Sequence, residues 1–229
     1  PDDEFIVATY HMPCIFWAPA VMSIHTSLAA QHLQRLSDGG RYPLIWAGDF
    51  NFKPSSPHYE FVTTGVMPPV AVDPADTEVD GKKTLPEAPC FPDDKWDITH
   101  LPRGPMRSAY AAFKGKEPAF TNHALTADSK ANKPFTHTLD YLFWSDGDKY
   151  RGAVAKLKPV GVVELDELCA DILRQGLRSL PSKTEPSDHL LLGAEFELFY
   201  EPTGHVSLSA KAHAGQPPRA AAAAGSQTS

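Results

Sequence analysis

Two polar residues at a spacing of two, Asp49 and Asn51, follow an apolar run over residues 44–47. The run is typical of a buried strand, and we expect it to stop at Gly48, which allows backbone to approach a ligand closely. Residues i and i+2 of an extended backbone point to the same side, so a carboxylate and an amide project together. The carboxylate suits ordering of a water or a hard cation, and the amide suits donation to a phosphate oxygen. The alternative is a structural turn, since Asp and Asn are both common turn residues.

Three further polar sites lie at the edges of expected strands: His11, Asp140, and Asp188 with His189. Asp is depleted in strands and is rarely buried without a partner, so Asp140 predicts a partner such as an imidazole. Taken singly, His11 is more typical of a surface or capping residue, and Asp188 with His189 is equally consistent with a simple loop. The order and spacing of all the sites are more specific than any one of them.

These residues depend on a small set of expected elements. Apolar patterns predict strands over residues 5–10, 44–47, 139–144, 154–163 (broken at Pro159) and 189–200, and helices over 22–36, 57–64 and 165–180. Ser56 as N-cap, Pro57 in the first turn and Gly65 past the end delimit the second helix. The last helix is expected to turn its apolar side chains inward, namely Leu168, Ile172, Leu173 and Leu177. If the first two strands pair in parallel, their crossover is expected to be right-handed.

The rest of the chain is less regular. Residues 66–107 are rich in Pro and polar residues without a sustained period, which predicts a long loop of the functional or disordered kind. Order is expected to resume over residues 106–113. We expect residues 1–200 to form one folded unit, and the Ala-, Gly-, Ser- and Pro-rich residues 201–229 to form a disordered tail.

The composition narrows the class of protein. A length of 229 residues suits one domain, and no stretch approaches the roughly 20 apolar residues of a membrane span, so no stable membrane insertion is expected. The formal net charge of -7 argues against nonspecific nucleic-acid binding through bulk charge, although it allows a basic cleft or a metal. Cys14, Cys90 and Cys169 are odd in number and widely spaced, which favours neither a disulfide framework nor zinc. We expect an intracellular, cytoplasmic protein.

The motifs together resemble the C-terminal half of the endonuclease/exonuclease/phosphatase (DNase-I-like) superfamily. The residues that carry the resemblance are His11, Gly48-Asp49-Phe50-Asn51, Leu139-Asp140-Tyr141 and Ser187-Asp188-His189. The resemblance implies an α/β fold in which two mixed β-sheets pack as a sandwich with flanking helices, in four layers. It also implies hydrolysis of phosphate esters with a divalent metal.

The resemblance implies a catalytic role for each motif. Asp49 would orient and deprotonate the attacking water, and Asn51 would help to hold water and phosphate. His11 and His189 would donate to the non-bridging oxygens, and Asp140 would hydrogen-bond His189 and favour its charged form.

A metal site is implied at Asp49 and Asp188. Magnesium fits a site of carboxylates, an amide and water, and manganese is the alternative.

A second resemblance concerns the substrate. Phe120-Thr121-Asn122, followed by Phe135 and Asp140, is similar to the deadenylase, nocturnin and 2′-phosphodiesterase group. This implies that Asn122 and Phe135 contact a nucleotide base, whereas ordinary packing for Phe135 and a turn for Asn122 are the alternatives. The loop departs from the usual pattern at Lys133 and His137.

The family's principal metal-binding Glu lies in its N-terminal half, and only residues 1–4 precede the first expected strand. We therefore expect the chain to hold part of an active site, to need the missing N-terminal half of its domain, and to be inactive and aggregation-prone alone. The expected function is a magnesium-dependent phosphodiesterase of RNA or a nucleotide, a deadenylase-like 3′-exonuclease. The alternatives are a lipid or inositol phosphate hydrolase of the same superfamily and a catalytically inactive interaction module.

Overall fold

Two β-sheets pack together in the computed structural model, which describes residues 4–15, 18–68, 78–79, 82–83, 100–102, 104–125 and 133–203. The first sheet has the order β1-β2-β8-β5. Its strands are β1 (Ile6–Thr9), β2 (Leu44–Asp49), β8 (Asp140–Ser145) and β5 (Arg107–Ser108). β1 and β2 pair in parallel and β2 and β8 pair antiparallel, so this sheet is mixed, as expected. The register sets Asp49 opposite Asp140.

The second sheet has the order β11-β10-β9 and is antiparallel in the described residues, not mixed as expected. Its strands are β11 (Ala194–Pro202), β10 (Ala153–Val162) and β9 (Lys149–Tyr150). Pro159 does not end β10, because a register shift between Pro159 and Gly161 accommodates the missing N–H.

The inner faces of the two sheets share a small apolar core. Trp144 of the first sheet lies with its ring centroid 6.1 Å from that of Phe196, and Leu157 is buried beside them. Charged residues point outward from the second sheet, among them the exposed Lys158 and Glu197. A sheet with one charged face is expected to have that face in water. The two sheets therefore pack as the β-sandwich that the sequence predicted.

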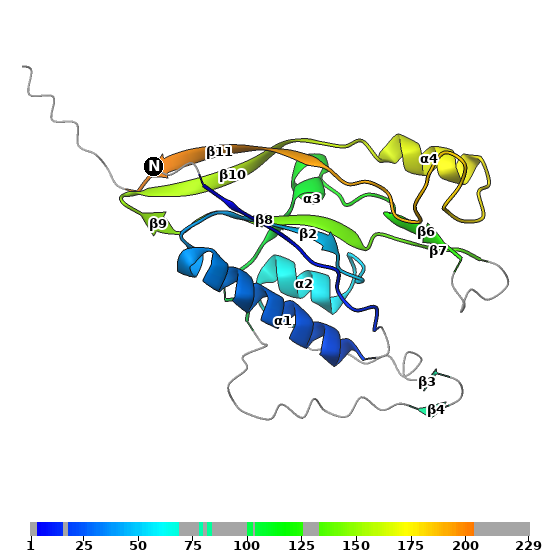
Figure 1. Cartoon of the computed structure of the whole chain (residues 1–229), viewed down its shortest axis with the longest axis horizontal. Coiled ribbons are helices and arrows are strands. Elements are labelled where there is room, and N and C mark those ends of the chain that lie inside the picture. The colour runs from blue at the N-terminus through cyan, green and yellow to red at the C-terminus, as the bar shows by residue number, and fades with distance from the viewer. Residues whose placement is uncertain are drawn as a thin grey trace, which may run out of the picture.

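The outer face of the first sheet is covered by two helices, α1 (Pro19–Leu36) and α2 (Pro57–Thr64) (Figure 1). Buried Met22, Leu33 and Phe61 pack there against Leu44 and Trp46 of β2. The boundaries of α2 are those expected from its capping residues. The Ser56 side chain accepts a hydrogen bond from the Tyr59 N–H, and Gly65 ends the helix at a φ of 78°.

Shorter elements complete the fold: η1 (Asp38–Gly40), α3 (Ala109–Lys114), α4 (Asp166–Arg174), and two ribbons of β3 (Glu78–Val79) with β4 (Lys82–Lys83) and β6 (Asn122–Ala124) with β7 (Phe135–His137). Figure 1 shows the β6–β7 ribbon near α4, at one end of the molecule. Within the described part, no helix combines the length and the apolarity that crossing a membrane requires.

Several expected boundaries were wrong. The helix expected over 165–180 ends at Arg174, two residues before Gly176 at a φ of 63°, and Leu173 is 56% exposed although it was expected to face inward. The strand expected from residue 189 begins at Ala194, because the backbone at His189 pairs with β6 instead.

Two further differences concern element ends. β2 continues through Gly48 to Asp49. β11 runs two residues beyond the expected boundary at residue 200, while the rest of the expected tail, residues 204–229, lies outside the described residues. Most of the loop expected over 66–107 also lies outside them.

Candidate active site

The segment after β1 stays hydrogen-bonded to the end of β2. The Tyr10 N–H donates to the Ala47 carbonyl at 3.0 Å, and the Met12 N–H donates to the Asp49 carbonyl at 2.8 Å. Gly48 has a φ of 146°, and a Cβ at this position would lie 1.9 Å from the Tyr10 carbonyl oxygen. The close approach predicted for Gly48 is therefore made by Tyr10, and it brings His11 beside Asp49.

Asn51 holds the Asp49 carboxylate in place. Its N–H donates to Asp49 Oδ1 at 2.8 Å, and its Nδ2 donates to the Met12 carbonyl at 2.7 Å and lies 3.3 Å from Asp49 Oδ2. Asn51 is 4% exposed and has a φ of 52°, which Asn tolerates better than most residues. The turn that the structural alternative predicted is therefore present, and it orients the Asp49 carboxylate. The predicted contact of Asn51 with water and phosphate stays a prediction.

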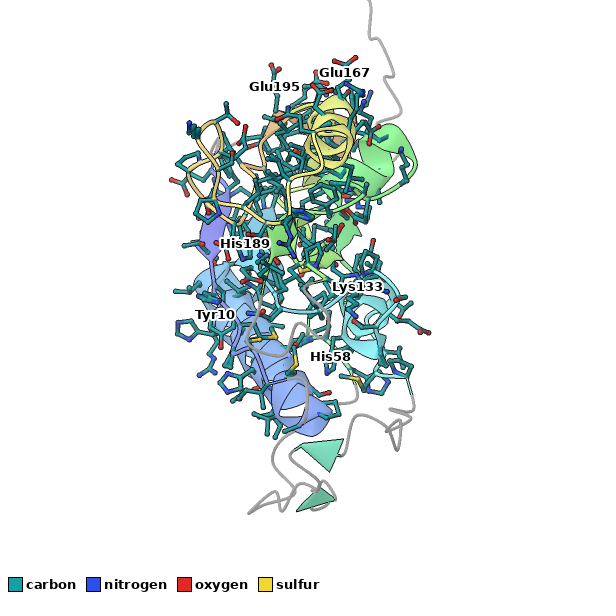
Figure 2. The ribbon with its side chains drawn as sticks, turned by 90° about the vertical axis from the view of Figure 1, so that its right-hand side faces the viewer. Tyr10, His58, Lys133, Glu167, His189 and Glu195 are labelled. Carbon is teal, nitrogen blue, oxygen red and sulfur yellow. The ribbon has the colours of Figure 1, made fainter. Side chains whose placement is uncertain are left out.

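Two imidazoles converge on the Asp49 carboxylate. Asp49 Oδ2 lies 3.4 Å from His11 Nε2 and 3.9 Å from His189 Nε2. The His11 side chain is 76% exposed, whereas His189 is half-buried and lies near the centre of the face seen in Figure 2. Burial raises the pKa of Asp49, and the hydrogen bond from the Asn51 N–H opposes this shift. Asp49 is therefore a stronger base than an exposed carboxylate.

Asp140 has the imidazole partner that its place in a strand led us to expect. Its Oδ2 lies 2.8 Å from His189 Nδ1. This hydrogen bond is the main reason that the pKa of His189 is raised, because the carboxylate stabilises the imidazolium. It also leaves Nε2 of His189 facing the Asp49 carboxylate.

Thr121 joins the two members of this pair, and the sequence reasoning missed it. Its hydroxyl donates to Asp140 Oδ2 at 2.6 Å and accepts from the N–H groups of Leu139 and Asp140 at 2.9 and 3.1 Å. Its carbonyl accepts from the Leu190 N–H at 2.8 Å, next to His189. In the run Phe120-Thr121-Asn122, the sequence motif indicates a role for Asn122 only. A hydroxyl residue directly before it was the one signal for a second polar role.

The predicted base-contacting residues lie on the β6–β7 ribbon. Asn122 is 5% exposed, and its Nδ2 donates to the Asp188 carbonyl at 3.3 Å. Phe135 is half-buried, with its ring centroid 4.6 Å from that of His137. The structure thus shows Asn122 supporting the segment before His189, and the base contacts of Asn122 and Phe135 stay predictions.

A metal could be held by part of this constellation. Ligand atoms of Asp49, Asp140 and His189 all lie within 4.8 Å of one another. His189 Nδ1 and Asp140 Oδ2 are already bonded to each other, so Asp49 is the member that best fits a hard cation, which prefers oxygen ligands and keeps several waters. Asp188 lies outside this group, and its role as a ligand stays a prediction.

The chain is similar in sequence to known proteins that are named after carbon catabolite repressor protein 4 (CCR4). It is 30% identical over 202 residues to carbon catabolite repressor protein 4 homolog 4 of Arabidopsis thaliana, over 84% of this chain and 37% of that protein. Homolog 3 of the same plant is 28% identical over 191 residues, or 72% of this chain and 39% of that protein. The probable CCR4-Not complex 3′-5′-exoribonuclease subunit Ccr4 of Enterocytozoon bieneusi (strain H348) is 25% identical over 198 residues, or 84% and 32%. The chain spans about a third of the length of these relatives.

Solved structures show weaker likenesses. The human Nocturnin catalytic domain with bound sulfate is 20% identical with a TM-score of 0.43, over 85% of this chain and 47% of that chain. The structure of ANGEL2, a 2′,3′-cyclic phosphatase, was solved in complex with adenosine-2′,3′-vanadate. It is 19% identical to this chain with a TM-score of 0.49, over 83% of this chain and 56% of that chain. No protein-family model matches the chain.

The sequence relatives and the residues gathered around Asp49 agree on the class of protein. The chain belongs to the endonuclease/exonuclease/phosphatase superfamily. Its sequence relatives are of the carbon catabolite repressor protein 4 (CCR4) type.

Proposed function

We propose that the protein carrying this chain is a metal-dependent phosphodiesterase that acts on RNA or a nucleotide, as a deadenylase-like 3′-exonuclease. The name of one relative, a probable 3′-5′-exoribonuclease subunit, supports a hydrolase that acts on RNA. The observation that carries the proposal is the Asp49 carboxylate, which lies within 4 Å of two imidazoles, one of them bonded to Asp140.

The proposed chemistry is in-line displacement at phosphorus. Asp49 accepts a proton from the attacking water, and its raised pKa suits that task. Asn51 fixes the direction in which the carboxylate points, since it binds both carboxylate oxygens. The water then forms the new bond to phosphorus as the leaving oxygen departs.

The imidazoles stabilise the charge that develops on the phosphoryl oxygens. The hydrogen bond to Asp140 raises the pKa of His189 and so favours its charged form, whose Nε2–H donates to a non-bridging oxygen. His11 approaches from the exposed side of Asp49 and donates in the same way. Such fixed donors act mainly by electrostatic stabilisation of the transition state.

A magnesium or manganese ion would be held by Asp49, with Asp188 as the predicted second ligand. When bound, the ion would polarise a phosphate oxygen and offset negative charge. A half-buried carboxylate beside Asp140 is an environment that a cation would stabilise, since burial and Asp140 both disfavour the charge on Asp49.

The test compares the chain and the complete product of its gene, each assayed with magnesium and with EDTA. The substrates are poly(A) RNA, 2′,5′-linked oligoadenylate, NADP and sphingomyelin, and the variants are Asp49→Ala and His189→Ala. We expect magnesium-dependent turnover of an adenylate substrate by the complete product, with loss in both variants. Turnover of sphingomyelin alone, or no turnover of any substrate, would overturn the proposal.

A further inference from the structure

A cationic and aromatic cluster lies beside the Asp49–His189 constellation. It consists of Lys53, Phe135 and His137, and we call it the Lys53 cluster. Phe135 and His137 are two residues apart on β7, so their side chains share one face of the ribbon. Lys53 lies two residues after Asn51, in the segment that follows β2.

The three side chains are in contact. The Lys53 Nζ lies 5.6 Å from the centroid of the Phe135 ring, over its face. The Phe135 and His137 rings meet edge to face, at an interplanar angle of 69°. A lysine held over an aromatic ring gains a modest cation–π attraction, which orients its ammonium group without neutralising the charge.

The charge of the cluster is uncompensated within the described part of the chain. There, Lys53 makes no ion pair with a carboxylate, and the His137 ring makes no hydrogen bond. Burial, and after it the charge of the nearby Lys53, lower the pKa of His137. Half-buried donors without a partner are where an anionic group is expected to bind.

The backbone connects the Lys53 cluster to the catalytic pair. The His137 carbonyl accepts from the Thr121 N–H at 3.1 Å, and Thr121 in turn binds Asp140. His137 pairs with Asn122 in the ribbon, and Asn122 bridges to His189. The backbone of β6 therefore links the cluster to the segment that carries His189, whereas Lys53 belongs to the segment that carries Asp49.

We propose that the Lys53 cluster is a second anion subsite, which binds a phosphate group of the substrate other than the one that is cleaved. Lys53 supplies the charge, His137 a hydrogen bond, and the Phe135 ring an apolar wall against which the adjoining nucleoside lies. The inference rests on the proposed function for its substrate class. It predicts preference for a nucleotide with an additional phosphate, or for an oligonucleotide with an adjoining one.

Binding is measured without turnover, by titration calorimetry in EDTA with the complete gene product. The probes are adenosine 3′,5′-bisphosphate, adenosine and a short oligoadenylate. The variants are Lys53→Gln, Lys53→Arg and His137→Asn, with Lys158→Gln on the outward face of the second sheet as the matched control. Lys53→Gln should weaken bisphosphate binding by about tenfold, as loss of a charge-assisted hydrogen bond does. Lys53→Arg and Lys158→Gln should change it little, and adenosine should bind all variants equally.

Equal affinity of wild type and Lys53→Gln for both the bisphosphate and the oligoadenylate would overturn the subsite, as would an equal loss in Lys158→Gln or no binding of either probe by wild type. A Lys53 effect on the bisphosphate but not on the oligoadenylate would assign the subsite to free nucleotides, and the reverse to an internucleotide phosphate. The hydrolysis assay is separate. If binding depends on Lys53 but no substrate is hydrolysed, the subsite is supported and the proposed function is wrong. If a substrate is hydrolysed but binding does not depend on Lys53, the proposed function is supported and the subsite is wrong.

Discussion

His189 Nδ1 and Asp140 Oδ2 lie 2.8 Å apart, although 49 residues separate them in the chain. The contact joins a residue of a central strand to one on an irregular segment that β6 holds in place. Because Asp140 accepts this hydrogen bond, the His189 ring is fixed in both orientation and tautomer.

Replacement of Asp140 by Asn should abolish most activity while keeping the fold. The amide is similar in size but does not stabilise an imidazolium, so we expect kcat/KM to fall by about 100-fold or more. The measurement is steady-state turnover of the substrate identified for the complete gene product. Glu195→Gln, an exposed change on β11, serves as control and should keep full activity. Equal activity of the two variants would contradict the pairing.

Thr121→Val should lower kcat more than it raises KM, because the methyl group cannot donate to Asp140 Oδ2. We expect a loss of about tenfold, the value of one hydrogen bond to a charged group. Thr121→Ser keeps the hydroxyl and should restore most of kcat. If Ser and Val lose the same activity, the hydroxyl has only a packing role.

Gly48→Ala should destabilise the fold, because its Cβ would lie 1.9 Å from the Tyr10 carbonyl oxygen at a φ of 146°. We expect the free energy of unfolding in urea to fall by about 3 kcal/mol or more. The matched control is Gly161→Ala in β10, where the nearest atom to a new Cβ is 3.6 Å away on the Glu195 side chain. Similar losses in both variants would show that the Tyr10 contact is not the cause.

Activity should depend on pH in two opposite ways. His189 acts in its charged form, and the hydrogen bond to Asp140 raises its pKa above 6.5, so activity should be lost as the pH rises through that raised value. Asp49 acts as the carboxylate, and burial raises its pKa above 3.8, so activity should also be lost as the pH falls through its own raised value. Residual activity of Asp140→Asn should show its alkaline limb at lower pH than wild type. The measurement is kcat/KM against pH at constant magnesium, and an unmoved alkaline limb would contradict the assignment.

The stability of the fold should decrease on mild acidification because of His58. This residue is 5% exposed, and burial lowers its pKa below 6.5. Between the two values the unfolded chain binds a proton that the folded chain does not, so the free energy of unfolding decreases as the pH falls below 6.5. Urea unfolding of wild type and His58→Gln across this range measures the difference. The exposed His32→Gln should behave as wild type, and an identical pH dependence in His58→Gln would refute the prediction.

Local signals in the sequence were sufficient for several features. Ser56 and Gly65 set the ends of α2, because capping involves atoms within a few residues of each other. The spacing of Asp49 and Asn51 indicated a shared site. The carboxylate of Asp140 inside an apolar strand predicted a partner for it. The alternation of strand, helix and strand was compatible with a parallel pair, which β1 and β2 form.

Only the tertiary structure decided which distant atoms meet. Backbone pairing with β6 removed His189 from the strand in which its apolar neighbours suggested it lay, since the β6 partner is distant in sequence. Thr121 became the bridge between Asp140 and Leu190 for the same reason, and Gly48 proved to accommodate Tyr10. The chemical groups and their local geometry follow from short-range patterns of residues. Their convergence depends on contacts between segments far apart in the chain, which no local pattern encodes.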